Sequence, residues 1–400
     1  MRNKFAPTVI ALTLLSGFVF CGFASPASGA EAPKTIKIGA MISLTGPDGA
    51  VGGPAKAGYE LAIDEINQAG GVMVKAYGKK IPLELVLVDM ETDPEKAIAR
   101  AEHLNSQNVP VAVGTTLAAA AAEILEKDRL PFVVCFMTIR AVQDRGFKYF
   151  FNISPLNDTI PKTVFDVFGT LPKGTMPTKW AFIKQQTDYT TELFGFAKQM
   201  AAKRGIKVVY EGEYAPLTPD LSAVITGAKN AGAEVVFSQP NPPDGVTMLK
   251  QMAQLGYKPK ANVIILASDD PSWGKLGALG DYAIGAPEWH PDLKYPGVSE
   301  FNEAIKAKTG QLPFPYTGPA YATIKIVAAA IEKAGSLDRA AIRDAVAATD
   351  MMTVAGPTKF GPNNGRINDM RPAIQWQKGK MELIWPVNQK AKLIYPIPGK

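Results

Sequence analysis

The amino-acid sequence predicts an α/β protein built from two doubly wound lobes, each around a parallel sheet. Short apolar runs alternate with segments of helical periodicity, and this alternation begins again near residue 180. The chain has 400 residues, more than one hydrophobic core usually supports. Strands separated by helices form parallel sheets that carry helices on both faces, so two such series predict two lobes.

The first series contains four predicted strands and the helices that connect them. Its strands are expected at residues 36–42, 83–88, 109–113 and 132–136. The spacing of apolar residues over 55–67 predicts a helix with one buried face. Asp93-Pro94-Glu95 begins the next helix, because Asp is a good N-cap and Pro fits the first helical position.

The second series repeats this pattern and is followed by a mixed tail. Its strands are expected at residues 180–183, 207–210, 235–237 and 263–266, and its helices at 191–204, 221–230 and 245–255. Later helices are expected at 298–308, 321–333 and 338–348, and short strands at 373–377 and 382–385. The tail therefore adds helices and edge strands to the two sheets.

The first thirty residues have the pattern of a secretory signal. Arg2 and Lys4 precede an apolar run over 10–20, and Ser28-Gly29-Ala30 has the small residues of a cleavage site. The run is short for a membrane span. Bulky Phe20 argues against a lipid anchor on the cysteine that follows it. We therefore expect residues 1–30 to be removed and the mature protein to be periplasmic.

Charge and cysteine content exclude several classes of protein. The formal net charge of +6 is mild and dispersed, without the basic block that nucleic-acid binding requires. Of the two cysteines, Cys21 lies in the predicted signal, so Cys135 has no partner for an internal disulfide. Cys135 lies in an apolar run, which favours burial as a small hydrophobic residue.

No motif of an enzyme or of a cofactor site is convincing. The two histidines lack the spacing of metal ligands, and the glycine-rich segment 46–53 matches neither a dinucleotide fingerprint nor a phosphate loop. Ser272-Trp273-Gly274-Lys275 matches the Ser-x-x-Lys motif of penicillin-reactive enzymes, but no Ser-Asp-Asn motif follows it. We expect no catalysis, no cofactor and no metal.

Polar and aromatic residues gather where the predicted strands end, which is where ligands of such sheets bind. Hydroxyl groups beside helix starts favour a carboxylate, and an acidic side chain opposite them favours an ammonium. Each residue alone is equally compatible with capping a helix, but together they suit a zwitterion. The candidate ligand-binding residues are Thr115, Thr116, Phe136, Thr138, Tyr189, Asp269, Asp270 and Trp273.

Several of these segments carry a family resemblance. Residues 38–47, 58–71, 89–94, 130–138 and 316–337 resemble the extracytoplasmic solute-binding proteins of ABC importers. The resemblance is to the branched-chain amino-acid-binding group, the type I periplasmic binding proteins that include leucine-binding proteins. It covers nearly all of the predicted mature chain, and the N-terminal segments are the specific ones.

The resemblance implies a fold and a mode of binding. It implies two lobes joined by three crossings, one made of residues 34–153 and 285–353, the other of 154–284 and 354–400. Thr115 or Thr116 and a threonine matching Thr138 would hold a ligand carboxylate. Tyr189 matches the cleft tyrosine of the family, and Asp269 falls where an acid meets the ligand amine. The implied partner is an ABC permease of the inner membrane, and we expect a monomer.

Other positions depart from the family pattern and leave the ligand open. Residues 134–137 are bulkier than the usual small run, Asn241 replaces an aromatic residue, and Asp270 replaces a glycine. A small amino acid or a related carboxylate is the expected ligand, with an aromatic carboxylate or an amide as the alternative. A ligand sensor and a secreted hydrolase are the alternative functions.

Overall fold

The computed structural model describes residues 1, 31–367, 370–386 and 389–399, so the predicted signal lies outside the described residues. From residue 33 onward these residues form one compact unit. Its first sheet is parallel throughout, in the order β4-β1-β5-β6-β7. The strands are β1 (Ile36–Ile42), β4 (Leu83–Asp89), β5 (Val111–Gly114), β6 (Phe132–Val134) and β7 (Phe150–Asn152).

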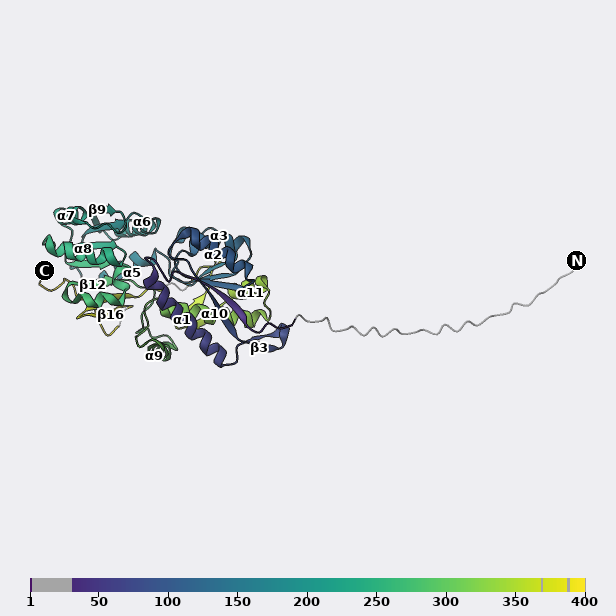
Figure 1. Ribbon diagram of the computed structural model, residues 1–400. Coiled ribbons are helices and arrows are strands. Elements are labelled where there is room, and N and C mark those ends of the chain that lie inside the picture. Colours follow the sequence, from purple (N-terminus) through teal and green to yellow (C-terminus); the bar gives the residue numbers. More distant parts are fainter. Residues whose placement is uncertain (2–30, 368–369, 387–388, 400) are drawn as a thin grey trace. The chain divides into compact units, whose positions relative to one another are not determined.

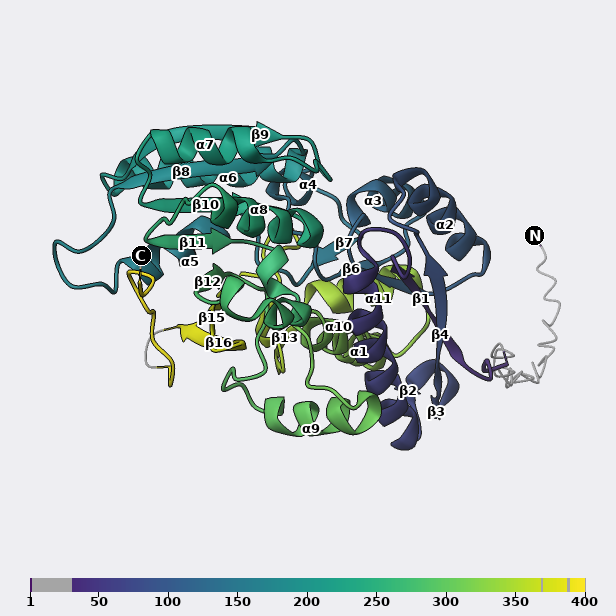
Figure 2. The same cartoon turned by 60° about the vertical axis from the view of Figure 1, so that its left-hand side comes forward.

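Helices cover both faces of this sheet (Figure 2). From β1 the chain crosses to β4 on one side, and from β4 it returns past β1 to β5 on the other side. Because these crossovers are right-handed, the two directions place their helices on opposite faces of the sheet. One pair consists of α1 (Gly49–Gln68) and α10 (Thr317–Ala334), and the other of α2 (Pro94–Ser106) and α3 (Ala118–Lys127). Asp93 caps α2 as expected, since its side chain accepts from the N–H groups of Glu95 and Lys96.

The second sheet is mixed, in the order β16-β15-β12-β11-β10-β8-β9, which Figure 2 shows from bottom to top; Figure 1 labels β9, β12 and β16 of this sheet. Its parallel strands are β8 (Lys179–Gln185), β9 (Lys207–Tyr214), β10 (Val235–Gln239), β11 (Ala261–Ile264) and β12 (Ala283–Gly285). Two antiparallel strands, β15 (Ala373–Gln377) and β16 (Lys380–Trp385), extend it at one edge. The helices that pack on it are α5 (Thr159–Phe168), α6 (Asp188–Lys203), α7 (Ser222–Asn230) and α8 (Pro242–Gln254).

Shorter elements complete the described chain. They are the hairpin strands β2 (Val72–Val74) and β3 (Lys79–Ile81) with η1 (Lys75–Tyr77) between them, α4 (Arg140–Gln143), η2 (Ala267–Asp269), η3 (Pro271–Leu279), α9 (Val298–Thr309), α11 (Arg339–Ala347), β13 (Asp350–Thr353) and β14 (Gly356–Lys359). The chain passes between the two sheets after β7, after β12 and before β15. This agrees with the three crossings that the resemblance implies. The exact limits of the two lobes stay a prediction.

Each sheet has a point where its strand order reverses, and ligands of such sheets bind at that edge. In the first sheet the reversal lies between β1 and β5, and in the second between β8 and β10. The loops that follow these strands contain several predicted site residues. The topology therefore brings together loops that are distant in the sequence.

The core of the second sheet is rich in aromatic side chains. Trp180, Phe182 and Phe237 are buried on its strands, with Phe165 and Phe168 on α5. Their rings meet edge-on or tilted, with centroid distances of 4.9 Å for Phe168 and Trp180 and 5.6 Å for Phe182 and Phe237. Such pairs are stabilising beyond the area that they bury, so this sheet is a rigid platform for the loops at its edge.

Element limits differ from the sequence expectations in three informative places. Helix α1 begins at Gly49 and contains Pro54, so it is longer than the expected 55–67. Tyr189 lies in the first turn of α6, not in a loop before it. Strand β6 ends at Val134, because Phe136 has a positive φ of 67° and cannot continue the strand.

The close packing of α1 on α10 depends on Gly58. A Cβ atom at Gly58 would lie 2.4 Å from the carbonyl oxygen of Thr317 and 3.0 Å from the backbone nitrogen of Tyr321. Both obstacles are backbone atoms of α10, so no side-chain rotation relieves the clash. The two helices must separate if this position carries a side chain.

We predict that Gly58→Ala lowers the free energy of unfolding by about 1–3 kcal/mol, the usual effect of overpacking. This loss occurs although alanine favours a helix over glycine by about 1 kcal/mol. The matched control is Gly53→Ala in the same helix, where a Cβ atom meets nothing within 4 Å. Chemical denaturation of both variants checks this, and equal stabilities would contradict it.

Candidate functional site

Thr115 and Thr116 follow β5 at the reversal point of the first sheet. Thr115 is fully buried and Thr116 is half-buried. Among the described residues, neither hydroxyl oxygen has a hydrogen-bond partner, although both atoms are buried. Buried polar atoms are rarely left unpaired in folded proteins. These two hydroxyl groups are therefore available to a ligand at the edge where ligands of such sheets bind.

Asp48 comes from the neighbouring loop, after β1. It stands at the N-cap of α1, but its side chain makes no capping hydrogen bond. Burial raises the pKa of the Asp48 carboxyl, and the nearby Thr116 hydroxyl opposes this rise. The two groups are close without meeting hydrogen-bond geometry. A carboxyl group thus lies near the Thr116 hydroxyl.

Phe136 and Tyr316 form an aromatic wall beside the end of β6. Their rings meet edge-on, with centroids 4.9 Å apart. The backbone N–H of Phe136, in its left-handed conformation, donates to Ser154 Oγ at 2.5 Å. Ser154 Oγ in turn donates to Glu288 Oε2 at 2.8 Å. This chain of contacts links the loop after β6 to two of the three passages between the sheets.

Thr138 and Tyr189 bring the two sheets together at the site. Thr138 follows β6 of the first sheet, and its carbonyl accepts from the Asn157 N–H at 2.7 Å. Burial raises the pKa of the Tyr189 phenol to about 12, and the Thr138 hydroxyl acts in the opposite direction. The charges of Asp269 and Glu288 add to the rise, whereas Arg371 counters it. Tyr189 therefore lies among groups from both sheets.

Asp269 is the most unusual titratable group of the site. It is 5% exposed, and its Oδ1 atom has no hydrogen-bond partner among the described residues. Burial raises the pKa of the Asp269 carboxyl to about 7, although the positive charge of Arg371 opposes this. The neighbouring carboxylates Glu288 and Asp270 raise it further. A buried carboxyl with an unpaired oxygen is a natural partner for a ligand cation.

The backbone before Asp269 is strained. Leu266 has φ 68° and ψ −59°, and the Ala267 N–H donates to the Ile265 carbonyl at 2.9 Å. This is the rare γ-turn with a positive φ. Such conformations persist only where the surrounding structure imposes them, and they cluster at functional sites. The strain turns the chain at the end of β11 and places Asp269 at the site.

Gly285 leaves room for this acidic loop. A Cβ atom at Gly285, in β12, would lie 2.7 Å from Asp269 Oδ1 and 2.5 Å from Ser268 Oγ. Any larger residue would therefore displace the carboxyl group. Asp270 has a different role, since its Oδ1 accepts from the Ser272 N–H at 2.7 Å and caps η3. Of these two neighbouring acids, Asp269 is therefore the candidate for contact with a ligand.

Arg371 holds the passages between the sheets together. Its buried guanidinium donates to the carbonyls of Pro155 and Ala286, both at 2.9 Å, and to Thr159 Oγ1 at 3.0 Å. Pro155 belongs to the first passage, Ala286 to the second and Arg371 itself to the third. One side chain thus fixes all three passages and places a positive charge near Asp269 and Tyr189.

The structure brings together most, but not all, of the predicted residues. Phe136 contacts the Tyr316 ring and is linked through Ser154 to Glu288. The charges of Glu288 and Asp269 act on Tyr189, which also feels the Thr138 hydroxyl, and Asp270 acts on Asp269 and Tyr316. Thr115 and Thr116 lie at the adjacent strand end. Trp273 instead donates from its indole N–H to the Gly280 carbonyl at 3.0 Å and lies close to Gly245. Its part in binding stays a prediction without support from these contacts.

Sequence reasoning missed five residues of this constellation. The missed residues are Asp48, Ser154, Glu288, Tyr316 and Arg371. The sequence could have indicated Asp48, because this residue follows the first predicted strand. Tyr316 precedes a predicted helix, a position that could have marked a loop. The other three lie in the passages between the sheets, where no strand or helix pattern indicates what a side chain faces.

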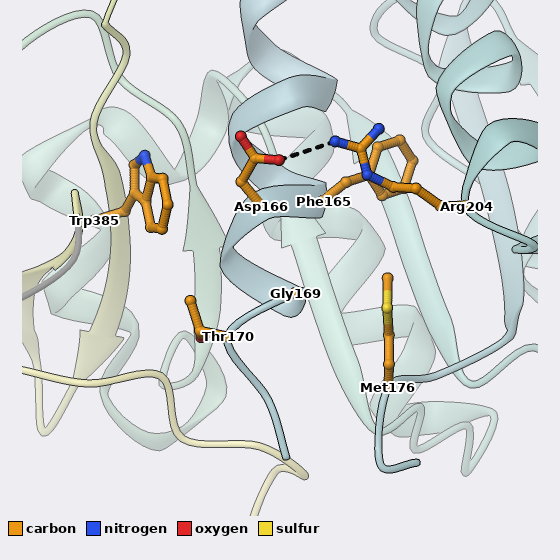
Figure 3. A pocket seen from close by; sticks show the side chains of 7 residues that line it. All are labelled: Phe165, Asp166, Gly169, Thr170, Met176, Arg204 and Trp385. Carbon is orange, nitrogen blue, oxygen red and sulfur yellow. Dashed lines mark hydrogen bonds and ion pairs between the residues drawn. The ribbon is translucent and has the colours of Figure 1, made fainter. Parts of the chain in front are cut away.

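Two cavities in the described part of the chain lie elsewhere. One of about 520 Å³ is open on the second sheet's helices and is lined in part by Met176 and Trp385 (Figure 3). In it, Arg204 pairs with Asp166 at 2.9 Å and its guanidinium lies 5.5 Å from the Phe165 ring centre. The other, of about 230 Å³, lies among α1, α9 and α10. No predicted site residue lines either cavity.

The described residues lack two kinds of feature. No group of three or more histidine, cysteine, aspartate or glutamate side chains in them has the arrangement of a metal site. In the same part of the chain, no helix combines the length and the apolar character that crossing a membrane requires.

Comparisons with known proteins agree with this fold. The chain is 28% identical over 383 residues to Leu/Ile/Val-binding protein homolog 7 of Brucella suis, a match that covers 90% of this chain and 94% of the relative. Its fold is similar to the branched-chain amino acid transporter substrate-binding protein LivJ of Streptococcus pneumoniae, solved with isoleucine. That match has a TM-score of 0.75 and 21% identity, and covers 91% of this chain and 100% of the other.

A second solved structure differs in its ligand. The solute-binding protein RPA0668 of R. palustris, solved with benzoate, matches with a TM-score of 0.75 and 17% identity, over 88% of this chain and 95% of the other. These likenesses show the type I periplasmic binding protein fold. The family model for periplasmic binding proteins matches residues 35–380. The chain therefore belongs to the periplasmic binding protein family.

Proposed function

We propose that this protein is the solute-binding component of an ABC importer and captures a small organic solute that carries an ammonium group. The family and the names of the relatives support a binding role without catalysis. The observation that supports the ammonium is the buried Asp269 carboxyl, whose Oδ1 has no hydrogen-bond partner in the described part of the chain. In this proposal, a permease of the inner membrane receives the solute from a periplasmic monomer.

Binding proceeds by closure of two lobes around the solute. The lobes comprise residues 34–153 with 285–353, and 154–284 with 354–400. Groups from both sheets, such as Thr138 and Tyr189, contact the solute together only in the closed form. Binding therefore shifts the population toward that form. The Arg371 contacts keep the three passages in register while the lobes move.

Glu192 of α6 supplies a contact that stabilises the closed form. Its two carboxylate oxygens accept from the N–H groups of Arg140 and Ala141, both at 2.9 Å, at the start of α4. One of these oxygens also accepts from the Asn157 amide at 2.9 Å. Helix α6 packs on the second sheet, whereas α4 follows the last residues of β6 in the first. Glu192 thus joins the two lobes directly beside Thr138 and Tyr189.

We predict that Asp269→Asn weakens binding of an amine solute by about 1.5–3 kcal/mol, the value of a hydrogen bond to a charged group. Titration calorimetry with L-leucine, L-isoleucine and their carboxamides measures this. Asp220→Asn, an exposed carboxylate before α7 in the second lobe, is the matched control and retains the parent affinity. Unchanged affinity in Asp269→Asn would remove the ammonium from the proposal.

The raised pKa of Asp269 predicts how binding depends on pH. Above its pKa of about 7 the carboxyl is charged and ready for an ammonium. Below that pKa it must first lose a proton, so affinity for a cation falls by up to about tenfold for each pH unit. Calorimetry from pH 5 to pH 8 tests this, and a flat profile would contradict it. In Asp269→Asn this component of the profile is absent.

The same pKa has the opposite consequence for stability. Between the unfolded value of 3.8 and the folded value of about 7 the folded state holds the extra proton. This group therefore lowers the free energy of unfolding as pH rises through that window, by up to about 1.4 kcal/mol per unit. Asp269→Asn is expected to be more stable than the parent at pH 8 in chemical denaturation. A variant that is less stable there would show that the carboxylate is well paired.

We predict that Glu192→Gln weakens solute affinity by about threefold to tenfold, because an amide oxygen replaces one charged acceptor and the other is lost. The expected loss lies in the dissociation rate, since opening becomes easier. Stopped-flow fluorescence measures it. Glu213→Gln removes a carboxylate that pairs with Lys184 within the second sheet, and serves as the control. If both variants dissociate at the parent rate, Glu192 does not hold the closed form.

A further inference from the structure

We infer that the solute is an amino acid whose side chain is uncharged and carries a hydrogen-bond donor, and that Gln239 recognises this side chain. The inference rests on the proposed function and narrows its class of solute. Its starting observation is the side chain of Gln239, which is 2% exposed. The Oε1 atom of this side chain is buried and has no hydrogen-bond partner among the described residues.

Gln239 lies at the point of the second sheet where ligands are expected. It is the last residue of β10, and the strand order reverses between β8 and β10. Ligands of doubly wound sheets bind at the carboxyl ends of the strands beside such a reversal. Figure 2 shows β10 between β8 and β11, and the segments that follow these two strands carry Tyr189 and Asp269. Gln239 thus stands between two residues of the candidate site.

The alternation of side chains along β10 indicates which face of the sheet Gln239 shares. Phe237 lies two residues earlier, so the two side chains lie on the same face. On that face the Phe237 ring meets the Phe194 ring of α6, with centroids 5.2 Å apart. Helix α6 runs back from the carboxyl end of β8, so its first turn, with Tyr189, lies nearer that edge than Phe194 does. Gln239 is therefore at the level of this first turn.

A second glutamine at the same edge has a different environment. Gln185 ends the neighbouring strand β8 and is 5% exposed. Its Nε2 donates to Asp244 Oδ2 at 2.7 Å. Buried polar side chains are paired in this way in most proteins, so a buried acceptor without a partner needs a separate explanation. For Gln239, at the edge where ligands bind, that explanation is the solute.

Gln239 and Asp269 are suited to different groups of one solute. Asp269 Oδ1 lies over β12, because a Cβ atom on Gly285 of that strand would be 2.7 Å from it. Strand β11 separates β12 from β10, and neighbouring strands are about 4.8 Å apart. The ammonium assigned to Asp269 therefore leaves Gln239 Oε1 for a second group. An amino acid provides such a group in its side chain.

The chemistry of the second group follows from the unpaired atom. Gln239 Oε1 is a hydrogen-bond acceptor, so the group that meets it must donate. An aliphatic side chain would leave this acceptor buried and unpaired, whereas a hydroxyl or a carboxamide would pair with it. Hydroxyls and carboxamides also accept, so they match either orientation of the Gln239 amide.

A charged side chain is disfavoured at this position. Burying a charge costs more than burying a neutral polar group unless an opposite charge pairs with it. Lys184 lies opposite Gln239 on β8 and already pairs with Glu213 at 2.9 Å, so the charge of its ammonium is compensated. An uncharged donor therefore suits the surroundings of Gln239 best.

The experiment compares amino acids of nearly equal shape that differ in one polar group of the side chain. Calorimetry at pH 8, above the pKa of about 7 of the Asp269 carboxyl, uses three pairs. They are L-threonine with L-valine, L-asparagine with L-leucine and L-glutamine with L-methionine. We expect the tightest polar member to bind about tenfold or more tightly than its apolar counterpart. L-glutamate is expected to bind more weakly than L-glutamine.

Each other result decides against a stated part. A preference below about threefold in every pair, or tighter binding of an apolar member, overturns this inference and leaves the proposed function standing. Tighter binding of L-glutamate than of L-glutamine overturns the uncharged side chain. If no amino acid of the three pairs binds, the inference and the proposed function both fail.

The variant Gln239→Met tests whether Gln239 causes the preference. Methionine has a similar length without the amide, so affinity for the polar member falls about tenfold and affinity for its apolar counterpart stays within about threefold. The matched control is Gln254→Met, at the exposed end of α8, which keeps the parent ratio. If Gln239→Met also keeps the parent ratio, Gln239 does not recognise the side chain. The comparison of pairs in the parent stands by itself should the variant fold poorly.

Discussion

The buried guanidinium of Arg371 is the interaction on which the two-lobed arrangement depends. Burying a charge is expensive unless hydrogen bonds compensate for the lost water. Here the compensation comes from oxygens of separate passages, Pro155 and Ala286, and from Thr159 at the start of α5. The structure can satisfy this cation only while the passages keep their relative positions. The same charge acts on Asp269 and Tyr189, so the junction between the sheets also tunes the site.

Local backbone strain on both sheets supports the same site. Phe136 follows β6 and Leu266 follows β11, and both adopt positive φ values that apolar side chains rarely take. Each turns the chain just before a candidate ligand residue, Thr138 in one case and Asp269 in the other. Buried hydrogen bonds, such as that from the Phe136 N–H to Ser154, compensate for part of this strain. Packing therefore imposes on the loops a geometry that their own residues disfavour.

The charged side chains of the candidate site are mostly acidic. The charges of Asp269 and Glu288 raise the pKa of both the Tyr189 and the Tyr316 phenol, and Asp48 follows β1 of the other sheet. The positive charge of Arg371 opposes this effect at Asp269 and Tyr189. In the proposed function, these charges favour a cationic solute and disfavour an anionic one. The aromatic core of the second sheet includes Ile265 and Leu266, and so supports the loop that carries Asp269 and Asp270.

The sequence by itself determined the α/β class, the two series of strands and the strand ends that carry the candidates. Local periodicity suffices for this, because apolar spacing and caps such as Asp93 act within a few residues. Element limits were less accurate where long-range contacts decide them, as at Phe136 and Tyr189. Only the tertiary structure decided that Asp269 Oδ1 has no hydrogen-bond partner among the described residues, and that Arg371, Glu288, Tyr316 and Asp48 join the site. Burial and charge at those residues come from segments far away in the chain, and no local pattern encodes which segments will meet.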